Sequence, residues 1–578
     1  MRFISIACLT FVVISPLAVS RASALEPDLI LHHGKIVTVD KNFSIHEAIA
    51  IVDGKILAVG ADDDILKLKG PRTESLDLEG RMLMPGLIDS HTHPANASMH
   101  EFDHEIPPME SISDVLDYVR RRAATLGPGV WIQVNQVFIT RLKEQRYPTR
   151  AELDEAAPDN PVVFSTGPDA SVNSLALKES GIDKDFKPST PGGLIERDAE
   201  GNPTGILRSA SQFLKAKYPK TKATTEQKDD RLAMLMADYN SLGITGIVDR
   251  HCSDVGIEQY RRMLAADRLT VRVGISASLS NSISLDKLAD RVQQIAHDPL
   301  ATGSPRLRII GVKTFLDGGM LTGSAYMREP WGVSRIYSID DPRYRGILYI
   351  EHDRLVAMVR AAVENHLQFT AHSVGDGAVH ALLDAYEEVN RGMPIAATRP
   401  CITHSNFMSN EAIEQAARLG VCMDIQPAWL WLDGKTLLAQ FGNDRLRWFQ
   451  PLKTIFASGA IVGGGSDHMQ KIGRRRSVNT YDPFLAMWVA MKRMPRGMDV
   501  PLHPEEALSR QQALRFSTAN NAWIMFLDDK VGTLEPGKLA DMIVVDRDLL
   551  ECPLDDVQDA QVLRTYVEGK LVYKREIE

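Results

Sequence analysis

The chain has 578 residues, with 66 Lys or Arg, 75 Asp or Glu and a formal net charge of −9. Hydrophobic residues make up 44 % and charged residues 24 %, which excludes collagen-like, coiled-coil and wholly disordered chains. The acidic balance disfavours a nucleic-acid partner, because such proteins carry a basic patch or stripe.

Residues 1–24 have the pattern of a secretory signal peptide. Arg2 supplies the positive charge, an apolar run follows, and the small residues Ala22 and Ala24 favour cleavage after Ala24. The run is short for a membrane span, which needs about 20 apolar residues, although a retained anchor is the alternative. We therefore expect a secreted or periplasmic protein with no membrane partner after cleavage.

Both ends of the mature chain contain short strand-like runs with tight turns, marked by Gly54 and Gly569. Short strands at opposite ends of a chain can pair in one sheet. We expect a small β-sandwich built from residues 25–84 and 529–578.

The middle of the chain alternates short apolar runs with amphipathic helical segments. About eight repeats of this alternation predict an α/β fold with a parallel sheet, most simply a (β/α)8 TIM-like barrel over residues 85–528. The stretch from about 95 to 240 is too long for one connection, so we expect it to be an insertion. The expected barrel strands are 87–90, 244–249, 271–275, 307–316, 367–372, 401–404, 421–425 and 461–467.

The sharpest local signal follows the first of these strands. His91 and His93 are two residues apart, so in a strand they point to the same side and can bind one ion. They fall at the carboxyl end of the strand, where barrel active sites lie. An isolated H-x-H is equally compatible with two hydrogen-bonded His on a surface turn.

Three further strands end in side chains that bind metal ions: His372, His404 and Asp467. Each alone is more often a polar strand end, but a barrel would bring all three to one mouth with His91 and His93. Imidazole and carboxylate ligands suit zinc or another divalent first-row ion.

Lys313 lies within the apolar run 309–316. Burial of an ammonium group is costly and lowers its pKa, and a neutral amine can take up CO2 as a carbamate. The alternatives are a lysine that extends out of the barrel and one that pairs with Asp317.

Two motifs near opposite ends of the chain add specificity. They are Pro-Gly-Leu-Ile-Asp-x-His-x-His at 85–93 and Glu-Pro-Gly-Lys-x-Ala-Asp at 535–541. With matches from about residue 27 to 573, the chain resembles the amidohydrolase superfamily, and within it the large bacterial group of N-substituted formamide deformylase-like proteins. The resemblance implies a barrel enzyme with two divalent metal ions, Zn2+ being the expected metal, and a CO2-derived carbamate on the bridging lysine.

The same resemblance implies a metal-dependent hydrolase of non-peptide carbon–nitrogen bonds. Hydroxide formed at the ions would attack an amide or formamide carbonyl, with Asp467 shuttling the proton. Carried over by position, the first ion is bound by His91, His93 and Asp467, the second by His372 and His404, and both by Lys313.

The substrate is expected to be a small amide-type molecule. Gln426, Trp131 and His251 are candidate substrate contacts, although packing or capping is the commoner role for each. Relatives usually have Ala-Pro or a similar pair after the aspartate, whereas this chain has His468 and Met469. That departure leaves the substrate open, and the sequence also leaves open whether the chain forms a homo-oligomer.

A zincin-type metallopeptidase is one alternative, because His100, Glu101 and His104 fit the H-E-x-x-H signature. That signature requires a helix that places both His on one face. Pro94 precedes the segment and Pro107 follows it, leaving barely two turns.

The presence of all six candidate ligands disfavours a metal-free structural or regulatory relative, which would keep the barrel and lose ligands. The glycines at 463–465 lack the Lys and Ser/Thr of a phosphate-binding loop and are interpreted as turn flexibility. The basic run 474–476 is either a solvated loop or a means of steering an anionic substrate.

Overall fold

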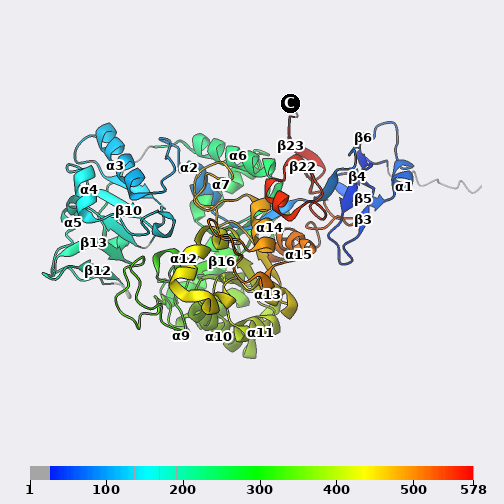
Figure 1. Cartoon of the computed structure of the whole chain (residues 1–578). Helices are drawn as coiled ribbons and strands as arrows, with labels where there is room; N and C mark the ends of the chain where they lie inside the picture. Colours follow the sequence, from blue (N-terminus) through cyan, green and yellow to red (C-terminus); the bar gives the residue numbers. More distant parts are fainter. Residues whose placement is uncertain (1–25, 136, 168, 190–192, 220–221, 577–578) are drawn as a thin grey trace, which may run out of the picture.

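The computed structural model describes residues 26–135, 137–167, 169–189, 193–219 and 222–576, so the expected signal peptide lies outside the described residues. Figure 1 shows three parts: a central barrel, a lobe with α3, α4 and β13 on one side, and strands from both chain ends on the other.

The central sheet consists of eight parallel strands in the order β20-β19-β18-β17-β16-β15-β14-β8. The sheet closes into a ring where Thr92 forms a bridge with His468, and the Asp467 N–H donates to the His91 carbonyl at 2.8 Å. The expected α/β barrel is thereby confirmed. Its strands are β8 (Leu87–Thr92), β14 (Ile244–Cys252), β15 (Arg272–Ser278), β16 (Leu307–Phe315), β17 (Gln368–Ser373), β18 (Cys401–His404), β19 (Cys422–Ile425) and β20 (Val462–Gly464).

Amphipathic helices cover the barrel. In α10, Val379, Leu382, Leu383, Tyr386 and Val389 follow the three-to-four-residue helical period and are buried, which fixes the face that packs inward. No described helix is both long enough and apolar enough to cross a bilayer. The covering helices are α6 (Thr225–Ser241), α7 (Asp254–Ala265), α8 (Leu285–Ala296), α9 (His352–Glu364), α10 (Asp376–Gly392), α11 (Asn410–Leu419), α12 (Ala428–Arg445), α13 (Leu452–Ser458), α14 (Pro483–Lys492), α15 (Arg510–Ser517) and α16 (Ala519–Ile524).

Strands from both chain ends share a six-stranded sheet, β23-β22-β21-β7-β2-β3, beside the four-stranded sheet β5-β4-β1-β6. Arg272 of the barrel donates from Nε to Oδ2 of Asp541 at 2.6 Å, a buried ion pair that ties the two parts together. The elements are β1 (Leu29–His32), β2 (Lys35–Val37), β3 (Ile45–His46), β4 (Ala48–Val52), β5 (Lys55–Gly60), α1 (Asp62–Leu66), β6 (Glu74–Asp77), β7 (Met82–Pro85), β21 (Met542–Val545), β22 (Val562–Val567) and β23 (Lys570–Lys574).

The chain between β8 and β14 forms a lobe around a five-stranded sheet, β12-β13-β11-β10-β9. The ion pair between Arg141 and Asp433, 2.8 Å from Nη2 to Oδ2, joins this lobe to α12 of the barrel. Its elements are α2 (Pro94–Met99), α3 (Ile112–Leu126), β9 (Ile132–Asn135), α4 (Arg150–Ala156), β10 (Val162–Ser165), β11 (Ala170–Val172), α5 (Ser174–Ser180), β12 (Leu194–Arg197) and β13 (Pro203–Arg208).

The three glycines at 463–465 serve close packing, so the interpretation as turn flexibility is wrong. None of them has a left-handed backbone. A Cβ atom on Gly465 would lie 2.2 Å from Oδ1 of Asp89, and one on Gly464 would lie 2.1 Å from Cζ of Phe516. Only glycine lets the last barrel strand approach the first strand and α15 this closely.

Candidate metal centre

The structure brings the six sequence-predicted ligands together at the carboxyl end of the barrel. All six line one cavity of about 1140 Å³. They come from four strands and one loop: His91 and His93 from and just after β8, Lys313 from β16, His372 from β17, His404 from β18 and Asp467 from the loop after β20.

The first group of ligands consists of His91, His93 and Asp467. The Asp467 Oδ1 atom lies 3.4 Å from Nε2 of His91 and 3.2 Å from Nε2 of His93. All three ligand atoms lie within 4.8 Å of one another. Two imidazoles and a carboxylate, with room for a further ligand, form a donor set that zinc enzymes use.

The second group consists of His372 and His404, whose ring centroids are 4.4 Å apart. The His404 ring also stacks on His91 at 4.8 Å, so the two groups are contiguous. Burial lowers the pKa of His372 to about 3, and burial holds the pKa of His404 well below its usual value. Both imidazoles are therefore neutral and able to act as ligands.

Lys313 lies between these groups, with its Nζ 3.5 Å from Nε2 of His91. Its side chain is buried, and burial lowers the pKa of the amine to about 8, against the attraction of Asp467. The amine therefore does not extend out of the barrel, and about a tenth of it is neutral at pH 7, far more than for an exposed lysine.

Backbone strain marks the same region. His251, His404 and Asp467 have φ values of 65°, 80° and 54°, in the left-handed region that non-glycine residues rarely occupy. Such conformations persist only where the surrounding structure holds them, and they cluster at functional sites.

Strand β19 supplies no ligand, but Asp424 within it and Gln426 directly after it orient two ligands. Oδ2 of Asp424 accepts a hydrogen bond from Nδ1 of His91 at 3.1 Å, and Oε1 of Gln426 accepts one from Nδ1 of His404 at 2.8 Å. Both contacts leave the Nε2 atoms free for a metal ion. Gln426 is fully buried behind His404, so the structure gives it a positioning role and no place on the cavity wall.

Asp424 and its counterion Arg250 were not predicted from the sequence. Asp424 also accepts from Oγ of Ser90 at 2.7 Å, and Nε of Arg250 lies 3.4 Å from its Oδ2. Burial raises the pKa of Asp424 to about 6, while Arg250 opposes that shift. A lone charge inside an apolar run was the signal that could have revealed Asp424, as it did for Lys313, whereas Arg250 stands between Asp249 and His251 and carries no such signal.

The other two candidate substrate contacts differ in position. His251 lines the cavity and its Nε2 lies 2.9 Å from Oγ of Ser278. Trp131 does not line the cavity: its indole is buried in the core of the lobe, and its Nε1 donates to Glu179 at 2.8 Å. Only His251 of this pair is in reach of a substrate in the cavity.

The H-E-x-x-H segment is not helical, so the zincin interpretation is wrong. Helix α2 ends at Met99, before Glu101 and His104. His104 Nε2 hydrogen-bonds the Tyr118 hydroxyl at 2.8 Å, and Glu101 pairs with Arg476 at 3.0 Å. The two His therefore do not share a helical face.

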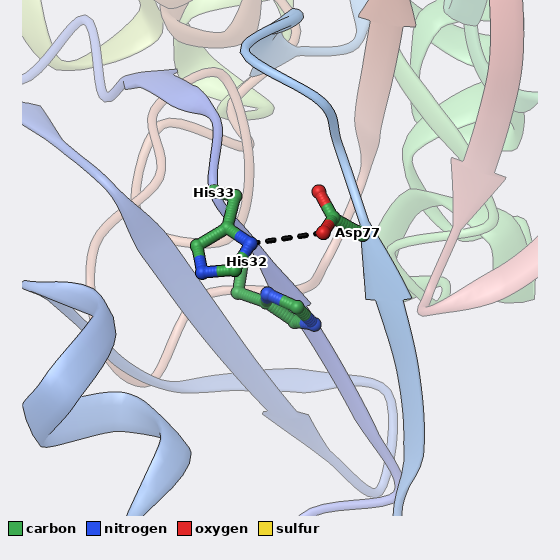
Figure 2. Close-up of side chains that lie close together, drawn as sticks. All are labelled: His32, His33 and Asp77. Carbon is green, nitrogen blue, oxygen red and sulfur yellow. Dashed lines mark hydrogen bonds and ion pairs between the residues drawn. The ribbon is translucent and has the colours of Figure 1, made fainter.

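A second cluster of metal-binding side chain types lies far from the cavity, on the sandwich. Figure 2 shows His32, His33 and Asp77, with Nδ1 of His33 at 2.9 Å from Oδ2 of Asp77. The His33 and Asp77 side chains are about half exposed, and none of the three residues lines the cavity. The barrel mouth is therefore the candidate active site.

Comparisons with known proteins agree with this geometry. The model of the amidohydrolase family matches residues 74–573. The N-substituted formamide deformylase of Arthrobacter pascens is 30 % identical over 562 residues, covering 95 % of this chain and 98 % of that protein.

Solved structures show the same fold. An uncharacterised metal-dependent hydrolase from Pyrococcus furiosus has a TM-score of 0.63 at 23 % identity, covering 90 % of this chain and all of that chain. Atrazine chlorohydrolase TrzN from Arthrobacter aurescens, solved with zinc, has a TM-score of 0.52 at 17 % identity, covering 94 % and 95 % of the two chains.

Proposed function

The chain belongs to the amidohydrolase family and is a hydrolase of carbon–nitrogen bonds; on this premise we propose that it hydrolyses small non-peptide amides, formamides among them, with two divalent metal ions. The observation that carries this proposal is the convergence of four His, one Asp and one buried Lys on a single cavity. The relative named as an N-substituted formamide deformylase supports the amide class.

The donor set fits the metal ions. His91, His93 and Asp467 would hold the first ion, His372 and His404 the second, and carbamylated Lys313 would bridge them. Support comes from the neutral imidazoles and from Asp424 and Gln426, which hold two Nδ1 atoms and leave the Nε2 atoms free. When bound, the ions would supply Lewis acidity toward the carbonyl and toward water, with zinc the expected metal.

Asp467 is proposed as the proton carrier. Its carboxylate would accept the proton of the attacking water and deliver it to the leaving nitrogen. Asn479 donates from Nδ2 to both the backbone carbonyl and Oδ2 of Asp467, at 2.9 and 3.3 Å, and so holds the strained loop in place. Trp429 stacks on His404 with ring centroids 5.0 Å apart and closes one side of the cavity.

The proposed location is the periplasm or the extracellular space, after cleavage following Ala24. This part of the proposal rests on the pattern of residues 1–24 alone. N-terminal sequencing of the exported protein tests it, and a start other than residue 25 or its close neighbours would contradict it.

The function is tested by metal analysis and a substrate panel. Metal-replete protein should contain about two ions per chain and should hydrolyse members of a panel of formamides, other amides, lactams and esters. The His93→Ala variant should lose one ion and nearly all turnover, while Trp131→Phe, which changes only the core of the lobe, should retain both. Protein without bound metal would instead support a scaffold role.

A further inference from the structure

We infer that the amide substrate carries a carboxylate, which Arg354 binds in the wall of the cavity. This inference rests on the proposed function and narrows it to amides of the N-acylated amino acid type. It is carried by an unpaired guanidinium on the same cavity wall as the metal ligands.

Arg354 lies in the first turn of α9 and lines the cavity. The chain just before it is fixed to the end of β16, because the Tyr349 N–H donates to the Leu316 carbonyl at 2.8 Å and Leu348 forms a bridge with Asp317. Asp317 in turn lies 3.8 Å from Nε2 of His372. This wall therefore adjoins the second group of metal ligands.

The Arg354 guanidinium has no partner among the described residues. Its Nε atom is buried and makes no hydrogen bond, and the side chain takes part in no ion pair within the described chain. A buried, unsatisfied N–H of a charged group is costly, so such a group is a site for a ligand oxygen. A carboxylate matches the planar fork of a guanidinium with two parallel hydrogen bonds.

The other arginines near the cavity are already neutralised. Arg208 pairs with Glu196 at 2.9 Å and Arg141 with Asp433 at 2.8 Å. In the basic run 474–476, Arg475 pairs with Asp482 at 2.9 Å and Arg476 with Glu101 at 3.0 Å. The basic run is thus used in ion pairs, which leaves Arg354 as the group that recognises an anion.

Glu351 lies on the same wall, three residues before Arg354, yet no ion pair joins the two. Its side chain is exposed, whereas Arg354 is partly buried, so water and salt screen the Glu351 charge more strongly. The Glu351 carboxylate still makes the electrostatic potential at this wall of the cavity more negative. Its removal should therefore strengthen the binding of an anionic substrate, the opposite of removing Arg354.

Apolar side chains complete the binding surface. Phe138, Phe315, Leu321 and Leu348 line the same cavity, which has a volume suited to ligands larger than a simple formamide. These side chains fit an acyl chain or an apolar amino acid side chain. The substrate that we infer is therefore an amide with an apolar body and one carboxylate.

The experiment compares matched substrates: N-formyl and N-acetyl amino acids against the same compounds with the carboxylate converted to a carboxamide. Wild type should prefer the carboxylate form. Arg354→Met should raise KM for that form by about 10- to 100-fold, as expected for a lost charged hydrogen bond, and leave the neutral form unchanged. Arg354→Lys should recover part of the loss, and Glu351→Gln should lower KM for the carboxylate form by about 2- to 5-fold.

Two results separate this inference from the proposed function. Hydrolysis of both forms with equal efficiency, unaffected by Arg354→Met, would refute the inference and leave the function standing. If neither form is hydrolysed, calorimetry with the free N-acyl amino acids decides the inference: binding lost in Arg354→Met supports the carboxylate site, and no binding to wild type overturns it. The proposed function itself then fails only if the wider panel of formamides, other amides and lactams is not hydrolysed either.

Discussion

Replacement of Asp424 by Asn tests whether β19 holds the metal ligands in place. The buried carboxylate accepts hydrogen bonds from Ser90 at 2.7 Å, His91 at 3.1 Å and Gln426 at 3.2 Å. The variant removes the negative charge that Nδ1 of His91 donates to, so this hydrogen bond weakens and His91 loses some of its basicity as a ligand.

The expected loss is about 1.5–3 kcal/mol for one hydrogen bond to a charged group. At 1.4 kcal/mol for each factor of ten, this corresponds to a metal affinity weakened by about 10- to 100-fold. The zinc dissociation constant, measured by competition with a chromophoric chelator, should rise by that factor. The absorption spectrum of the cobalt-substituted protein should also change.

A matched control separates ligand positioning from general destabilisation. Asp541 is likewise a buried aspartate paired with an arginine, Arg272, but it lies at the sandwich, away from the cavity. Asp541→Asn should lower the thermal midpoint and leave zinc affinity unchanged. If Asp424→Asn binds zinc as tightly as wild type, or if both variants weaken zinc binding equally, the positioning role is refuted.

Two further substitutions and one titration probe the site and the barrel seam, the junction where the chain after β20 meets β8. Glu101→Gln should retain full turnover, since Glu101 pairs with Arg476 and accepts the backbone N–H of Ile106 outside the cavity, and a loss as severe as that of His93→Ala would restore the zincin interpretation. Because the pKa of Lys313 is lowered to about 8, its amine is half neutral at that pH and nearly all neutral about one to two pH units higher. Carbamate formed from ¹³CO2 and read by NMR should therefore rise through pH 8 and level off above it. Loading that is independent of pH, or unchanged in Lys313→Met, would be contrary. Gly465→Ala should destabilise the fold by about 1–3 kcal/mol in urea unfolding, because its Cβ meets Asp89 and the backbone of His91, whereas Gly392→Ala, with open space around it, should change stability little.

The barrel and most of the candidate ligands could be predicted from the sequence for one physical reason. Parallel strands are covered on both faces, so they appear as continuous apolar runs, and the polar residue that ends each run points into the mouth. His372 and His404 lie where this rule puts them. At the last strand the rule leads to the ligand but not to the strand end, because β20 stops at Gly464 and Asp467 lies three residues further on, in the following loop.

The roles of individual side chains could not be predicted in the same way. Gln426 follows a strand as the ligands do, yet packing turns it behind His404 rather than into the cavity. Trp131 precedes a strand of the lobe, and only the tertiary structure shows that this lobe has its own core. Asp424 and Arg250 are interior charges that neutralise each other across strands, a pairing set by the closed ring.

The seam of the barrel has a consequence for how the protein is made. Asp89 and Ser466, 377 residues apart in the chain, are joined there by hydrogen bonds of 2.6 and 3.0 Å, and the first group of ligands straddles the same junction. Until β20 and the loop after it have been synthesised, the nascent chain contains His91 and His93 of this group but not Asp467. Tight ion capture by the first group is therefore coupled to completion of the ring, because an interrupted translation product lacks the carboxylate that completes this group.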